Sequence, residues 1–197
     1  MVSCVRYLTH PQVEVDAAVP VPAWSLSALG RQRVNALAAA GWLARTSQII
    51  ASAERKAIET AEILAAALGL GIEVREAMHE NDRSATGFLP PSEFEVVADA
   101  FFANPKISVR GWERAIDAQA RIVREMETVL ARSAHGDVLI VGHGAVGTLL
   151  LCHYGNFPIG RAYDQPGGGG NYFTVLGHER RLLHRWRPME VAPSAHS

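Results

Sequence analysis

The stretch "DVLIVGHGAVGTLLL", residues 137–151, decides the fold. It consists of an apolar run, a Gly-His-Gly turn and a second apolar run. A short β-branched run that ends at glycine is typical of a buried strand, so we predict a central strand at 137–142 and a buried helix at 145–154. The Gly142-His143-Gly144 turn interrupts the longest apolar stretch of the chain, so no membrane-spanning helix is expected there.

On both sides of this stretch, short strand-like runs alternate with longer runs of helical period. Further strands are predicted at 5–8, 47–52 and 72–74, with a C-terminal hairpin of 171–176 and 182–187. Further helices are predicted at 27–45 with Ser27 as its cap, 53–68 and 112–132, and residues 78–105 are predicted to be a loop with room for one short helix. This order predicts one domain, residues 1–197, with an α/β fold: a three-layer α/β/α sandwich with a mostly parallel central sheet.

Composition narrows the class of partner. The chain is 48% hydrophobic, and 19 basic against 20 acidic residues leave a formal charge of -1. No overall field would therefore recruit nucleic acid or an anionic membrane. Cys4 and Cys152 lie in apolar sequence, and the first residues do not resemble a secretory signal, so the cytoplasm is the expected location.

Polar side chains follow three of the predicted strands. His10 follows the first strand, Arg55 and Lys56 follow the 47–52 strand, and His143 follows the 137–142 strand. Ligands of parallel sheets bind beyond the carboxyl ends of the strands, where these side chains would meet. A single histidine at a strand end is more often structural, and two cations in a first helical turn are often only solvated, but an anion bound there would explain both.

Two histidines, a cation and a helix N-terminus suit an anionic ester, above all a phosphate. Phosphoryl transfer needs an in-line nucleophile and positive charge around the transferring group. Nearby cations disfavour imidazolium and keep a histidine neutral, which makes His10 a competent nucleophile. His143 would then donate to the phosphoryl oxygens.

A competing pattern is the G-x-G-x-x-G of Gly142, Gly144 and Gly147. It follows a strand, opens a helix and has Asp164 at roughly the spacing of a ribose ligand, as a dinucleotide-binding turn requires. However, only about fifty residues follow Gly147, too few for the rest of such a domain. The GGGG run at 167–170 lacks the Lys and Ser/Thr of a phosphate loop and reads as a flexible turn, and no zinc spacing is present.

Nearly the whole chain resembles the histidine phosphatase superfamily, the phosphoglycerate-mutase-like phosphatases. "VRYLTHPQVEVD" occupies the place of the strand that ends in Arg-His-Gly, and "IIASAERKAIETAEILA" is similar to the Ser-Ser-Pro-Leu-x-Arg-Ala segment. "HEND" falls where an acidic donor is expected, "GWERAIDAQARI" resembles the Gly-Glu-Ser helix, and "DVLIVGHGAVGTLLL" matches the strand and turn of the second histidine.

The resemblance implies a phosphomonoester hydrolase that uses no metal and no cofactor. His10 would be the residue that is phosphorylated, Glu80 the proton donor to the leaving alcohol and His143 the second phosphate ligand. The remaining phosphate contacts would come from four positions: Thr9, Arg55, Lys56 and Gly144. The expected partner is a small phosphorylated substrate or inorganic phosphate, and a homodimer stays open.

Two departures from the family pattern affect the expected activity. Thr9 and Pro11 flank the nucleophile in place of arginine and glycine, and Lys56 stands where the family has its second arginine. Threonine brings no charge, and lysine lacks the planar two-pronged grip of arginine on phosphate. Arg55 is the expected compensating cation. A homologue that binds phosphate or a phosphorylated ligand without turnover is therefore the alternative function. The other histidines are expected to be structural or on the surface: His79, His135, His153, His178, His184 and His196.

Overall fold

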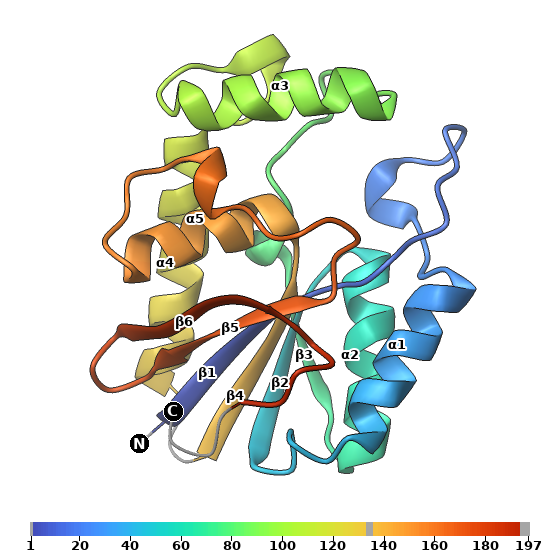
Figure 1. Cartoon of the computed structure of the whole chain (residues 1–197), viewed down its shortest axis with the longest axis vertical. Helices are drawn as coiled ribbons and strands as arrows, with labels where there is room; N and C mark the ends of the chain where they lie inside the picture. Colours follow the sequence, from blue (N-terminus) through green and yellow to red (C-terminus); the bar gives the residue numbers. More distant parts are fainter. Residues whose placement is uncertain (1, 133–135, 194–197) are drawn as a thin grey trace.

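A six-stranded sheet forms the centre of the computed structural model, which describes residues 2–132 and 136–193 (Figure 1). Its strands are β1 (Val2–Thr9), β2 (Thr46–Ser52), β3 (Ile72–Arg75), β4 (Gly136–Gly142), β5 (Asn171–Leu176) and β6 (Arg181–Pro188). They lie in the order β3-β2-β4-β1-β5-β6, and the first four are parallel. The C-terminal hairpin β5–β6 joins antiparallel to β1. The predicted fold class is confirmed.

Helices cover both faces of this sheet. The helices α1 (Ala28–Ala39) and α2 (Arg55–Leu68) lie on one face, and α4 (Ala115–Arg132) and α5 (Gly144–Tyr154) lie on the other (Figure 1). The helix α3 (Pro91–Ala103) lies beyond the end of the sheet, at the top of the same view. None of the helices in the described residues combines the length and hydrophobicity that a membrane span requires.

Side-chain alternation along β4 explains the two hydrophobic cores. Val138 and Ile140 pack into the core on the α4 and α5 side, whereas Leu139 and Val141 pack into the core on the α1 and α2 side. Because both faces of a parallel strand are covered, all four positions are apolar, and the strand reads as a continuous hydrophobic run. This is the run that the sequence shows at 137–142.

Two helices differ from the prediction. Ser27 caps α1 as expected, its hydroxyl accepting a hydrogen bond from Gly30 N at 3.1 Å, but the helix ends at Ala39 rather than at residue 45. Gly41 has a φ of 75°, a left-handed conformation that stops the helix. In the stretch predicted as a loop, α3 forms a full helix because Phe101 and Phe102 pack into the core beside Trp112.

A tyrosine from β1 supports the turn after β4. The Tyr7 hydroxyl accepts a hydrogen bond from His143 N at 3.0 Å and donates one to His143 O at 3.2 Å. A Cβ atom on Gly142 would overlap this hydroxyl, and a Cβ atom on Gly147 would overlap the same ring and lie 2.9 Å from Trp186. Both glycines are therefore required by close packing around Tyr7, which fixes the backbone of His143.

We expect Gly142→Ala to lower the free energy of unfolding by about 1–3 kcal/mol, because the added methyl group must displace the buried Tyr7 ring. Gly71→Ala is the matched control, since nothing lies within 4 Å of its Cβ position. Chemical denaturation of both variants measures the difference. Equal stability of the two variants would contradict the packing role of Gly142.

Candidate active site

The two predicted histidines lie side by side at the carboxyl edge of the sheet. Thr9, the last residue of β1, pairs with Gly142, the last residue of β4, so the next residue of each strand reaches the same place. His10 N donates to Gly142 O at 3.0 Å. The His10 and His143 ring centroids are 5.3 Å apart, and the ring planes make an angle of 66°. The structure thus brings together the two imidazoles that sequence reasoning singled out.

A contact with the backbone sets the tautomer of His10. Its Nδ1 lies 2.8 Å from Pro11 O, a contact in which Nδ1 must be the donor because a carbonyl oxygen only accepts. The neutral ring therefore carries its lone pair on Nε2. Burial, reinforced by the positive charge of Lys56, lowers the pKa of His10 to about 4. The ring is consequently neutral at pH 7.

The backbone of His10 is covered by the glycine run 167–170. Gly170 N donates to His10 O at 3.1 Å, and a Cβ atom on Gly169 would overlap the same carbonyl oxygen. Gly168, Gly169 and Gly170 all have φ between 64° and 89°, where glycine is strongly favoured. The run that reads as a flexible turn therefore has a specific conformation, which packs against the candidate nucleophile.

His143 is completely buried, and its two ring nitrogens differ in their hydrogen bonding. Its Nε2 lies 2.8 Å from the Ser52 hydroxyl, whereas its Nδ1 has no hydrogen-bond partner in the described part of the chain. Burial lowers the pKa of His143 to about 3, although the carboxylates of Glu54 and Glu80 act in the opposite direction. With Ser52 donating to Nε2, the neutral ring presents an Nδ1–H that can donate to a ligand oxygen.

Glu80 lies next to His143, at the N-terminus of α5. Its carboxylate accepts hydrogen bonds from Ala145 N at 3.1 Å, Val146 N at 2.9 Å and Asn81 N at 3.1 Å. The first N–H groups of a helix have no partner within the helix and attract anions, so the carboxylate is positioned by the helix end. The structure therefore places Glu80 beside His143, and its role as proton donor stays a prediction.

An arginine of α4 anchors the loop that carries Glu80. The Arg121 guanidinium donates to Ala77 O at 2.8 Å, His79 O at 3.0 Å and Glu80 O at 3.3 Å. It also pairs with Glu113 at 2.7 Å. These contacts tie the segment "HEND" to the segment "GWERAIDAQARI", so the longest helix fixes a loop from another part of the chain.

Three of the predicted phosphate ligands make close contacts within the protein. The Thr9 hydroxyl is buried and donates to Gln165 Oε1 at 2.7 Å. Lys56 is also buried, and its ammonium group donates to Val21 O at 2.9 Å and forms an ion pair with Glu54. Gly144 is the first residue of α5, where a Cβ atom would overlap the side-chain amide of Gln165.

Arg55 does not reach the histidines. Its side chain is 62% exposed and pairs with Glu59 at 3.1 Å, one turn further along α2. Consecutive helical residues point about 100° apart, so only one of Arg55 and Lys56 can face the strand ends. Lys56 occupies the buried direction, and the expected compensation by Arg55 is not what the structure shows.

Two charged residues near the histidines were not singled out by the sequence reasoning. Glu54, 8% exposed, lies between Lys56 and His143. Arg83 lies close enough to His10 for its charge to lower the pKa of that ring. The available signals were the carboxylate two residues before Lys56 and the arginine three residues after Glu80.

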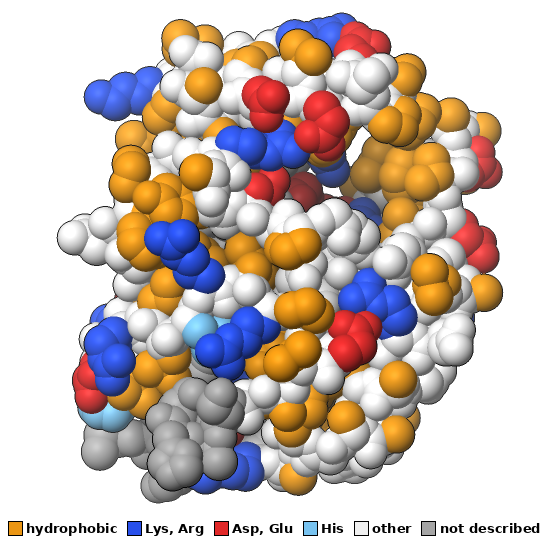
Figure 2. Space-filling view, viewed as in Figure 1, with side chains coloured by type: hydrophobic (Ala, Val, Ile, Leu, Met, Phe, Trp, Pro, Cys, Tyr) orange, Lys and Arg blue, Asp and Glu red, His pale blue; other side chains and the backbone are white. Residues whose placement is uncertain are grey.

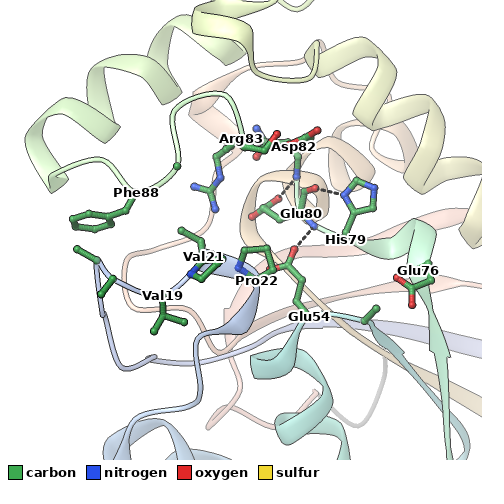
Figure 3. Close-up of a pocket in the computed structure, with 17 residues that line it drawn as sticks. Val19, Val21, Pro22, Glu54, Glu76, His79, Glu80, Asp82, Arg83 and Phe88 are labelled. Atoms are coloured by element: carbon green, nitrogen blue, oxygen red, sulfur yellow. Dashed lines mark hydrogen bonds between the residues drawn. The ribbon is translucent and has the colours of Figure 1, made fainter.

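A cavity of about 710 Å³ opens beside these residues. Its polar lining includes Glu54, Glu80 and Arg83, and its apolar wall is formed by residues 17–22 and Phe88. Figure 2 shows a hollow in the upper part of the molecule with acidic and basic side chains inside it. In the close-up, Arg83 points into the cavity from the loop above, and Phe88 and Val19 close one side (Figure 3).

The remaining polar candidates have structural contacts. Asp164, the residue at ribose-ligand spacing, accepts from Thr148 Oγ1 and Gln165 N at 2.8 Å each and pairs with Arg161.

The other histidines are spread over the structure. His79 lines the cavity and lies 2.6 Å from Glu80 O, while His153 and His178 are exposed. His184 Nε2 lies 2.9 Å from Thr174 Oγ1. His135 and His196 lie outside the described residues. No cluster of three or more His, Cys, Asp or Glu residues within 2–132 and 136–193 could hold a metal ion.

The histidine pKa values predict a pH dependence of stability. Burial lowers the pKa of His10 to about 4 and of His143 to about 3, from an ordinary 6.5. Between the folded-state and ordinary pKa values, the unfolded chain binds more protons than the folded chain. The free energy of unfolding therefore has its full value above pH 6.5 and falls as the pH drops towards 4 for His10 and 3 for His143. We expect the free energy of unfolding, measured with urea, to fall between pH 7.5 and 5.0.

The variant His10→Ala should show a smaller fall over the same interval, because one of the neutral buried rings is absent. The surface variant His178→Ala is the control and should behave like the parent protein. Glu54 does not contribute to the difference, because its pKa falls from an ordinary 4.5 to about 2 and both values lie below the interval. An unchanged pH dependence in His10→Ala would contradict the lowered pKa of His10.

Comparisons with known proteins show a family match and a common fold. The model of the histidine phosphatase superfamily (branch 1) matches residues 17–183, a range that includes Lys56, Glu80 and His143 but begins after His10. The position of His10 beside His143 therefore comes from the structure alone. A search of curated proteins found no match.

Several solved structures share the fold. A mycobacterial glucosyl-3-phosphoglycerate phosphatase in complex with inorganic phosphate has a TM-score of 0.79 at 22% identity, covering 96% of this chain and 99% of its own. A mutant phosphoserine phosphatase from Entamoeba histolytica in complex with phosphoserine has a TM-score of 0.77 at 12% identity, covering 94% and 97%. A putative alpha-ribazole-5'-P phosphatase from Escherichia coli has a TM-score of 0.76 at 12% identity, covering 97% and 99%.

At these identities the solved structures establish a common fold, whereas the family match spans most of the chain. The three glycines of the G-x-G-x-x-G pattern each have a close neighbour within the protein: Tyr7 at Gly142 and Gly147, and Gln165 at Gly144. The chain belongs to the histidine phosphatase superfamily, branch 1.

Proposed function

We propose that this protein hydrolyses a small phosphomonoester through a phosphohistidine formed on His10. The observation that carries the proposal is the pair of neutral imidazoles with ring centroids 5.3 Å apart, one of which has its Nδ1 tied to Pro11 O. A neutral imidazole with a fixed lone pair is a nucleophile at neutral pH. Membership of a phosphatase family supports the choice of phosphorus as the reacting atom.

The residues have separate roles in this reaction. Nε2 of His10 forms a bond to phosphorus as the bond from phosphorus to the ester oxygen breaks, and Glu80 gives a proton to the leaving oxygen. Nδ1 of His143 donates to a phosphoryl oxygen and stabilises its charge. Glu80, now a carboxylate, takes a proton from water as the water attacks phosphorus, which breaks the bond to His10 and releases inorganic phosphate.

Positive charge for the phosphoryl group comes from Lys56 and Arg83 in this proposal. Lys56 is buried beneath the site, and its charge lowers the pKa of His10. Arg83 forms no ion pair with any described residue, and it packs with its guanidinium carbon 5.1 Å from the Phe94 ring centroid. Its planar guanidinium suits a phosphoryl group better than a lysine does. Arg83 thus replaces the charge that Thr9 and Arg55 do not bring to the site.

A binding protein without turnover is the second candidate. The observation that favours it is that Thr9 brings no charge and that Lys56 is already paired with Glu54. Loss of one charged contact to a transferring phosphoryl group costs several kcal/mol of barrier, on the order of a thousandfold in rate. Such a site would still hold phosphate or a phosphorylated ligand.

Turnover of p-nitrophenyl phosphate separates the two candidates. We expect release of p-nitrophenol, and after rapid denaturation in base we expect protein-bound phosphate that is stable in base and lost in acid, as a phosphohistidine is. Binding of inorganic phosphate without p-nitrophenol release and without bound phosphate would favour the second candidate. Absence of both turnover and phosphate binding would refute the two together.

A further inference from the structure

Glu54 has an unusual position for a carboxylate at the start of a helix. It is the N-cap residue of α2, but its side chain makes no capping hydrogen bond to that helix. The carboxylate instead turns towards the strand ends, and only 8% of the residue is exposed to solvent. Figure 3 shows it at the base of the cavity, directed towards the backbone of Glu80.

Three kinds of group surround this carboxylate. The Lys56 ammonium donates to Oε2, and Glu80 N donates to Oε1 at 2.8 Å. Oε1 also lies 3.5 Å from Nε2 of His143. A cation and a backbone N–H are groups that proteins use to bind phosphate, and here they hold an anion that belongs to the protein itself.

The carboxylate is ionised at neutral pH. Burial acts to raise the pKa of Glu54, but His143, Lys56 and the hydrogen bond from Glu80 N outweigh it and hold the pKa at about 2. The negative charge is therefore a permanent feature of the site, and it lies against the lysine whose charge the proposed function assigns to the phosphoryl group.

We propose that Glu54 is an internal anion that limits the affinity of the site for phosphate, because its carboxylate competes with the phosphoryl group for Lys56. The inference rests on the proposed function, in which Lys56 supplies positive charge to the phosphoryl group. Glu54 would thereby set specificity, because the site gains little affinity from the phosphate group alone. A substrate must therefore obtain affinity from its alcohol part, for which residues 17–22 and Phe88 provide an apolar wall.

A purely structural role for Glu54 makes a different prediction. Removing one partner of a buried ion pair usually destabilises a protein, because the other charge is left without compensation. In that case Glu54→Gln would be less stable but would bind phosphate no better. Competition predicts that the same variant binds phosphate more tightly, since the freed lysine can pair with the ligand.

Isothermal titration with inorganic phosphate at fixed pH and ionic strength tests the inference. We expect Glu54→Gln to bind phosphate at least about tenfold more tightly than the parent protein. Glu62→Gln is the matched control, because it removes the same charge from an exposed position on α2. Adding Lys56→Met to Glu54→Gln should abolish the gain, since the lysine is what the substitution releases.

A second variant covers the case in which Glu54→Gln does not fold. The double variant Glu54→Leu with Lys56→Arg removes the carboxylate and supplies a guanidinium, and thermal unfolding shows whether each protein is folded. Phosphate affinity within about twofold of the parent in folded variants would overturn the inference. Tighter binding in a protein that never turns over p-nitrophenyl phosphate would support the inference while refuting the proposed hydrolysis.

Discussion

The variant His10→Ala should lose at least about a thousandfold in kcat/KM for p-nitrophenyl phosphate, and it should carry no base-stable phosphate after denaturation. The reason is that Nε2 of His10 is the atom proposed to attack phosphorus. His143 cannot take over, because its Nε2 accepts a hydrogen bond from Ser52 at 2.8 Å and its Nδ1 carries the proton, so neither nitrogen has a free lone pair. Stopped-flow or steady-state release of p-nitrophenol measures the loss, and radiolabelled phosphate measures the intermediate.

His178→Ala is the control for this experiment, since it removes an imidazole that is exposed on the surface. It should keep full activity and full labelling. Binding of inorganic phosphate by folded His10→Ala shows whether the pocket is intact. Turnover within about tenfold of the parent rate in His10→Ala would rule out a phosphohistidine at this position.

Glu80→Gln should have an effect that depends on the leaving group. For an alkyl phosphate, whose alkoxide needs a proton as it departs, we expect kcat/KM to fall by about 10²–10⁴-fold. For p-nitrophenyl phosphate the fall should be far smaller, because p-nitrophenolate is a weak base and leaves without a proton. Parallel assays with the two substrates measure this difference.

The comparison between substrates separates proton donation from a structural role. Glu80 accepts hydrogen bonds from Ala145 N and Val146 N, so its replacement also perturbs the start of α5. A purely structural defect would slow both substrates equally. Equal losses for the alkyl and the aryl ester would therefore contradict the role of Glu80 as the proton donor, while Glu62→Gln should leave both rates unchanged.

Much of the fold follows from local patterns in the chain. The alternation of β-branched runs with helical periods predicts the sheet, its helices on both faces and the C-terminal hairpin, because strand and helix periods are local properties. The sequence predicts only a short helix where α3 lies, because the apolar residues of α3 follow a polar, proline-containing stretch. Only their packing beside Trp112 makes the helix evident.

Some residues of the candidate site can be predicted from the sequence, and others cannot. His10 and His143 are predictable because each follows an apolar strand, and parallel strands end at a common edge. The direction of Lys56 and Arg55 is not predictable, because both neighbours are cations and the pattern does not say which faces inward. The pairing of Lys56 with Glu54 depends on burial that no local pattern reports.

The sequence by itself therefore determined the layers of the fold and the positions of two histidines at strand ends, since both depend on periodicity and chain order. Only the tertiary structure decided which charges meet those histidines. Glu54, Glu80 and His143 come from three separate segments, and their contacts arise when β2, β4 and the loop before α3 converge. Electrostatic interactions depend on distance in space, which the order of residues along the chain does not specify.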